Sequence, residues 1–140
     1  MSTVLWANLL VSNRVTSAQA DLHALYKHAD KLDALSKSLG VTHFLSICDM
    51  TDVRCNHAEV DLPVGMKSTD ELMAVQGSWV AVADAIAMLE TLRNHIVKHK
   101  VRFGMLSNQH GAVVAELAEA ISYAQSERSS AQKFNFSVVE

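Results

Sequence analysis

The chain has 140 residues, the size of one typical domain, and 49% of them are hydrophobic, which is enough for an ordinary core. The net charge of −3 argues against partners that need a basic face, such as nucleic acid or an anionic membrane. The apolar run at the N-terminus is too short to cross a bilayer, and no Lys or Arg precedes it as in a signal peptide. We expect one globular domain over residues 1–140, located in the cytoplasm.

The two ends of the chain predict strands. Residues 4–11 (VLWANLLV) are a continuous apolar run with β-branched and aromatic members, which favours a buried strand over a short helix. The pair Ser12 and Asn13 then predicts a turn. Near the C-terminus, residues 134–138 alternate apolar and polar side chains, the period of a half-buried strand. We expect these strands to pair in a small antiparallel sheet that packs on helices.

The first predicted helix covers about residues 17–39. Thr16 and Gln19 fit a capping box at its start, and Gly40 supplies the flexible residue that commonly follows a helix end. Apolar residues recur at spacings of three and four, which places them on one face: Leu22, Leu25, Ala29, Leu32 and Leu39.

The middle of the chain has weaker patterns. Residues 43–50 (HFLSICDM) fit a strand or a short helix, and residues 49–66 predict an irregular connection. Ser68 and Glu71 form a second capping box, so we expect a short helix that ends near Gly77.

Two long helical patterns follow. The first runs from Trp79 to about His99 and is apolar nearly all round in its first half, which indicates a central position or a contact between two copies of the chain. Ser107 is the predicted cap of the second. The whole pattern predicts an α+β fold, mainly helical with about four helices, and a small antiparallel sheet that pairs the N- and C-terminal strands.

The densest group of metal-ligand residue types lies at residues 48–57. Two thiolates, an imidazole and a carboxylate can satisfy tetrahedral zinc, and this segment offers all four: Cys48, Asp52, Cys55 and His57. The spacing C-x6-C-x-H differs from the short C-x(2–4)-C knuckle of specific zinc motifs. The alternative is one buried cysteine followed by a polar loop. No cofactor is otherwise implied.

Charge is distributed unevenly along the chain. Residues 49–71 contain six acids and two bases, whereas residues 91–104 contain four bases and no acid. Such a separation can steer and orient a charged protein partner, although acidic loops are also common on ordinary surfaces. The acids that we expect to contact a partner are Asp49, Asp52, Glu59 and Asp61.

Other candidate chemistry is weaker. His95 and His99 lie one turn apart on a predicted helix, but basic neighbours disfavour a metal there, and the HExxH pattern is absent. No G-x-S-x-G elbow or glycine-rich phosphate loop occurs, so the sequence predicts no particular enzyme activity.

The leading hypothesis is therefore a small, soluble, non-enzymatic interaction domain, such as an adaptor, inhibitor or immunity-like protein. It would bind a protein partner partly through residues 49–71, or associate with itself. The alternatives are a metal-binding protein that uses residues 48–57 and a small-molecule binder or enzyme with a site between the helices.

Overall fold

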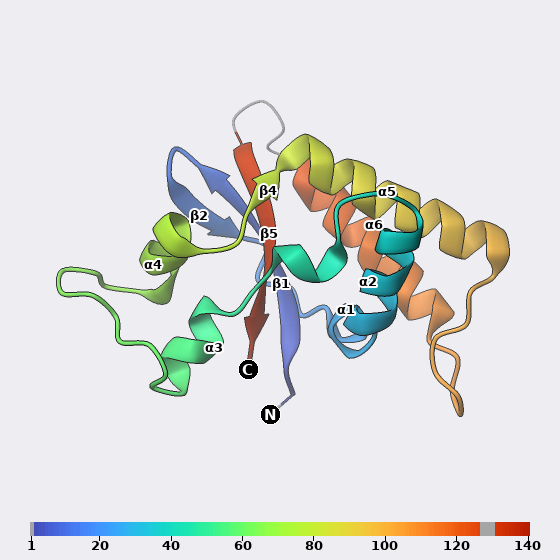
Figure 1. Ribbon diagram of the computed structural model, residues 1–140, viewed down its shortest axis with the longest axis horizontal. Helices are drawn as coiled ribbons and strands as arrows, with labels where there is room; N and C mark the ends of the chain where they lie inside the picture. Colours follow the sequence, from blue (N-terminus) through green and yellow to red (C-terminus); the bar gives the residue numbers. More distant parts are fainter. Residues whose placement is uncertain (1, 127–130) are drawn as a thin grey trace.

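A pair of antiparallel strands joins the two ends of the chain (Figure 1). The computed structural model describes residues 2–126 and 131–140; the other residues of the predicted 1–140 domain lie outside the described part. Strand β1 (Val4–Val11) pairs with β5 (Ala131–Val139) along nearly its whole length. The predicted pairing of terminal strands is thereby confirmed.

Three shorter strands complete the sheet. Strand β2 (Arg14–Ser17) forms a hairpin with β1 through Ser12 and Asn13, which both have positive φ, as a tight hairpin turn requires. The far edge of β5 pairs with β3 (Cys48–Asp49) in parallel and with β4 (Val80–Ala81) in antiparallel orientation. The sheet is small and mainly antiparallel, as predicted, with the β3–β5 pair as its parallel part.

Helices cover both faces of this sheet (Figure 1). Four lie on one side: α1 (His23–Lys27), α2 (Ala29–Ser38), α5 (Val82–His99) and α6 (His110–Ser126). The other side carries α3 (Thr51–Asn56) and α4 (Thr69–Gln76), and the short 3-10 helix η1 (Phe44–Ile47) leads into β3. The α+β fold is therefore confirmed, and in the described residues four of the six α-helices have eight residues or more.

The two faces of the central strands differ in chemistry. One face, here called the core face, packs against α1, α5 and α6 and carries the buried side chains Leu5, Ala7, Leu9, Phe134, Phe136 and Val138. Residues of opposite parity form the second face, here called the polar face, where the polar residues Asn8, Asn135 and Ser137 lie beside Trp6 and the buried Val4 and Leu10. The polar face lies beneath α3 and α4, and its residues Asn8, Asn135 and Ser137 are buried.

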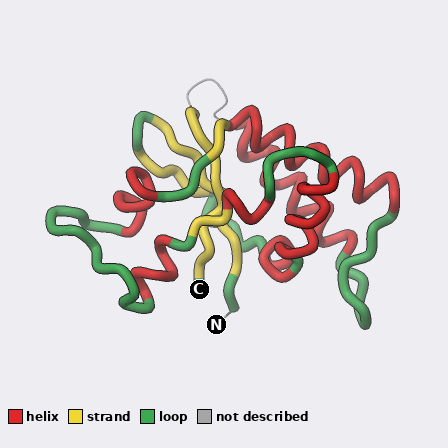
Figure 2. The backbone as a smooth tube through the Cα atoms, viewed as in Figure 1, coloured by secondary structure: helices red, strands yellow, loops and turns green. Residues whose placement is uncertain are grey.

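Residues 50–79 form an excursion between β3 and β4, here called the cap segment. It contains α3, an extended loop and α4, and both of its ends lie at the same edge of β5 (Figure 2). Asp49 joins these ends, because its carboxylate accepts hydrogen bonds from Thr51 N at 2.9 Å and from Ser78 N at 2.7 Å. The cap segment contains nearly all of the acid-rich residues 49–71.

The first helix differs most from its prediction. Residues 14–17 belong to β2, and helix begins only at His23, so Thr16 and Gln19 form no capping box. The first turn is capped instead by Glu116 of α6, whose carboxylate accepts from Ala24 N at 3.2 Å and Leu25 N at 3.0 Å. A break at His28 then separates α1 from α2.

Other boundaries shift for identifiable reasons. The predicted cap at Ser68 is confirmed, since its hydroxyl accepts from Glu71 N. Helix α5 begins at Val82, three residues later than predicted, because β4 pairs with β5. Asn108, and not Ser107, holds the start of α6 by accepting from His110 N at 3.1 Å.

Two segments with open or irregular predictions are also defined. Residues 43–50, for which the sequence allowed a strand or a short helix, contain both: the 3-10 helix η1 is followed directly by strand β3. The predicted irregular connection contains the short helix α3. Within the described part of the chain, no helix has both the length and the apolar character that a bilayer crossing requires.

Candidate functional site

The four predicted metal ligands point to different neighbours. The Cys48 thiol donates to Phe44 O at 3.4 Å, and burial raises its pKa to about 12, which disfavours the thiolate that zinc needs. His57 Nε2 lies 2.9 Å from the Glu140 carboxylate, and that hydrogen bond raises the imidazole pKa. The Asp52 carboxylate accepts a hydrogen bond from the Thr69 hydroxyl, and the Cys55 thiol is not part of a disulfide. No group of three or more His, Cys, Asp or Glu in the described residues is arranged to hold a metal ion.

The four acids predicted to contact a partner separate into two groups. Asp49 is 4% exposed and uses its carboxylate to join the ends of the cap segment, so it stabilises the fold and presents no surface to a partner. Glu59 and Asp61 are exposed in the loop between α3 and α4. Asp52 lies between these extremes, half-buried on α3.

Buried amides organise the polar face next to Asp52. Asn135 is completely buried and donates from Nδ2 to Ser78 O at 3.0 Å, so its Oδ1 points the other way. That oxygen accepts from Asn8 Nδ2 at 3.0 Å. This hydrogen bond also fixes the orientation of the Asn8 amide, so that Asn8 Oδ1 faces away from Asn135.

A cavity of about 190 Å³ lies between the polar face and the cap segment; we call it the acidic cavity. Strands β1 and β5 supply part of its wall, and α3 and α4 each supply a carboxylate. Its lining residues are Trp6, Asn8, Ser17, Gln19, Asp52, Asp70, Met73, Ser137 and Val139.

Two carboxylates meet at the acidic cavity. Asp52 Oδ1 accepts from the Thr69 hydroxyl at 2.8 Å, and its Oδ2 accepts from Asn56 Nδ2 at 3.2 Å, so its orientation is fixed. Partial loss of hydration raises the pKa of Asp70, and the negative charge of Asp52 raises it further. The fold thus holds two like charges close enough to repel each other.

Two side-chain oxygen atoms of the polar face have no hydrogen-bond partner within the described part of the chain. No described residue bonds the Ser137 hydroxyl or Asn8 Oδ1, although these residues are only 3% and 1% exposed. Every completely occluded side-chain N or O atom in the described part of the chain has a partner, so these two oxygens must reach open space. The acidic cavity, which both residues line, provides that space.

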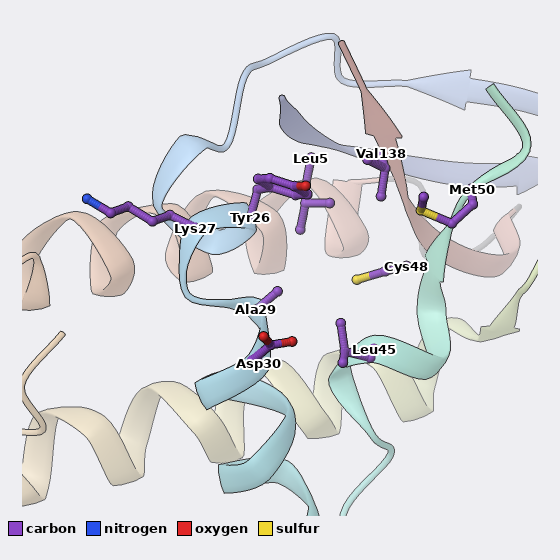
Figure 3. A pocket seen from close by; sticks show the side chains of 9 residues that line it. All are labelled: Leu5, Tyr26, Lys27, Ala29, Asp30, Leu45, Cys48, Met50 and Val138. Atoms are coloured by element: carbon purple, nitrogen blue, oxygen red, sulfur yellow. The ribbon is translucent and has the colours of Figure 1, made fainter. Parts of the chain in front are cut away.

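A larger groove lies on the other face of the sheet. It has a volume of about 650 Å³ and is lined by Leu5, Tyr26, Lys27, Ala29, Asp30, Leu45, Cys48, Met50 and Val138. Figure 3 shows the Cys48 side chain pointing into the space between α1, α2 and η1. Tyr26, Leu45 and Met50 are each at least 40% exposed, so apolar surface gathers around this groove. We call it the apolar groove.

No family model, no curated protein and no solved structure matches the chain. The two sites must therefore be judged on their own geometry.

Among the residues that line the acidic cavity, only Asp52 is predicted from the sequence as a candidate site residue. Asp70 lies within the acid-rich residues 49–71, and Ser137 lies within the predicted strand at residues 134–138, but neither pattern marks them as site residues. The available signal was Asn8, a strongly polar residue in the middle of an otherwise apolar strand. A buried amide of this kind needs partners, and it therefore indicates a second polar layer.

Proposed function

We propose that the protein is a non-enzymatic interaction domain that binds a positively charged protein segment through the cap segment. The observation that carries this proposal is the pair of carboxylates, Asp52 and Asp70, that the fold holds together at a cavity. Like charges so close are unfavourable alone and become favourable when a cation approaches both.

The surrounding charge supports the same partner class. With Asp49 buried, residues 49–71 still carry five other acids against Arg54 and Lys67. Glu59 and Asp61 are exposed on the loop of the cap segment. Acids of this kind speed the encounter with a basic partner and orient it, and their effect weakens as salt screens the charges.

The test uses a peptide of alternating Arg and Gly residues, with a Glu–Gly peptide as the negative control. We expect the wild-type chain to bind only the basic peptide, more weakly at high salt. The double variant Glu59→Lys/Asp61→Lys should bind about tenfold more weakly at low salt. Isothermal titration calorimetry measures both effects.

A matched control separates a local effect from net charge. Asp84→Lys/Glu119→Lys makes the same change in charge at exposed positions on α5 and α6, outside the cap segment. We expect it to retain most of the wild-type affinity. Equal losses in the two double variants would show that the peptide responds only to overall charge.

The apolar groove supports a second candidate, the binding of a small apolar molecule. Its volume lies in the range of ordinary ligand sites, which is roughly 300–1,000 Å³. The fluorescent apolar dye ANS is a suitable probe. Leu45→Asp should abolish saturable dye binding, whereas Val75→Asp, at an exposed position on α4 outside the groove, should not. Retained binding in Leu45→Asp would exclude the groove.

A further inference from the structure

The acidic cavity has an excess of hydrogen-bond acceptors. Asn8 Oδ1 is an acceptor only, and its orientation is fixed by the chain of amides that ends at Ser78 O. The Ser137 hydroxyl can also accept. Both oxygens belong to buried residues and have no hydrogen bond among the described residues, so they favour a ligand that brings its own N–H donors.

The charge at the cavity specifies the sign of that ligand. Asp52 and Asp70 contribute two carboxylates, and the charge of the first raises the pKa of the second. Among the described residues, no Lys or Arg lines the cavity. A bound cation would be attracted by both carboxylates and would offset the repulsion between Asp52 and Asp70.

Size and shape restrict the cation further. A volume of about 190 Å³ equals that of about six water molecules in the liquid, which matches the end of one long side chain. Trp6 forms part of the wall, and its ring is fixed because Nε1 donates to Asp21 Oδ1 at 2.7 Å. An aromatic wall suits an organic cation, and a guanidinium can also stack on it.

From these observations we infer that the acidic cavity binds the cationic end of a single Lys or Arg side chain supplied by the partner. The N–H groups of that side chain donate to Asn8 Oδ1, the Ser137 hydroxyl and the carboxylates of Asp52 and Asp70, and its stem lies along Trp6. This inference rests on the proposed function and specifies which part of the partner is recognised.

The experiment uses n-butylguanidinium, which mimics the end of an Arg side chain, and n-butylurea, a neutral molecule of nearly the same shape. Each is titrated into the full chain labelled with ¹⁵N, and the Trp6 Nε1 and Asn8 Nδ2 signals are followed. We expect butylguanidinium to bind saturably and move both signals. Butylurea should bind at least about tenfold more weakly, because it lacks the charge that strengthens each hydrogen bond.

Variants place the binding in the cavity. Asp70→Asn and Ser137→Ala should each weaken butylguanidinium binding, the first by about tenfold or more. Both should fold, since Asp70→Asn removes a repulsion and the Ser137 hydroxyl has no hydrogen bond within the described residues to lose. Asp84→Asn is the matched control, because it removes one charge at an exposed position on α5, outside the cavity lining.

The outcomes separate this inference from the proposed function. Equal binding of the urea and the guanidinium, no saturable binding, or equal losses in Asp70→Asn and Asp84→Asn would each overturn the inference. If the Arg–Gly peptide nevertheless binds and loses affinity in Glu59→Lys/Asp61→Lys, the proposed function remains. If butylguanidinium binds as expected and the peptide does not, the cavity recognises a cation and the protein-interaction proposal fails.

Discussion

Asp33 shows how a single buried charge is stabilised in this fold. Burial would raise the pKa of its carboxyl, but hydrogen bonds from Leu45 N and Lys37, together with the Lys37 charge, outweigh burial and lower the pKa. The Leu45 N–Oδ1 distance is 2.9 Å, and so is the Lys37 Nζ–Oδ2 distance. Asp33 thereby joins α2 to η1.

The Asp33→Asn variant should lower the free energy of unfolding at neutral pH by about 1 kcal/mol, because it removes a charge-assisted hydrogen bond. A carboxyl with a lowered folded-state pKa stabilises the fold above its unfolded pKa of about 3.8. The stabilisation is lost as pH falls through the lower folded value. The difference between variant and wild type should therefore shrink over this acidic range.

Urea unfolding at a series of pH values measures this effect. The control is Asp30→Asn, an exposed acid on the same helix, which should change stability by less than about 0.5 kcal/mol. A loss in Asp33→Asn that is independent of pH would show that the carboxylate charge does not contribute.

At the scale of elements, several structures with a local cause could be predicted from the local sequence. The strand at residues 4–11 and the capping box at Ser68 were predicted from neighbouring residues alone and are confirmed. The same holds for the helix end before Gly40, which has a φ of 71°. Hydrophobic period and cap chemistry act over a few residues and can be read directly.

Elements with distant causes could not be predicted in this way. Strands β3 and β4 have two residues each and exist because β5 offers its free edge to both. The acidic cavity has the same origin, since Asp70 and Ser137 are far apart in the chain and meet only when the cap segment covers the polar face. Charge pattern could therefore predict the acidic segment but not its cavity.

The start of α1 provides a test of such a distant cause. Glu116→Ala removes the carboxylate that caps Ala24 N and Leu25 N, and it should lower the free energy of unfolding by about 0.5–2 kcal/mol. Hydrogen exchange at these two amides should become faster. Glu119→Ala, at an exposed position on the same helix, is the control. Unchanged exchange in Glu116→Ala would exclude the cap.

At the scale of the whole molecule, the sheet separates two kinds of interior. The core face carries apolar side chains, and the polar face carries buried amides. The larger helical layer covers the first face, and α3 and α4 cover the second (Figure 1). The Asn8 and Asn135 amides are paired with each other and with Ser78 O, as buried polar groups require. The Lys or Arg side chain that we propose as the ligand would contact Asn8, Ser137 and the two carboxylates, and it would give this polar layer a function.

The measurement that tests this account most directly is a titration of the Arg–Gly peptide into the ¹⁵N-labelled chain, with every amide and indole signal followed. We predict that the largest changes occur at Trp6 Nε1, Asn8 Nδ2 and the backbone amides of Asp52, Asp70 and Ser137. The largest changes at Tyr26 and Leu45 of the apolar groove, or on α5 and α6, would contradict the account and place recognition on the opposite side of the sheet.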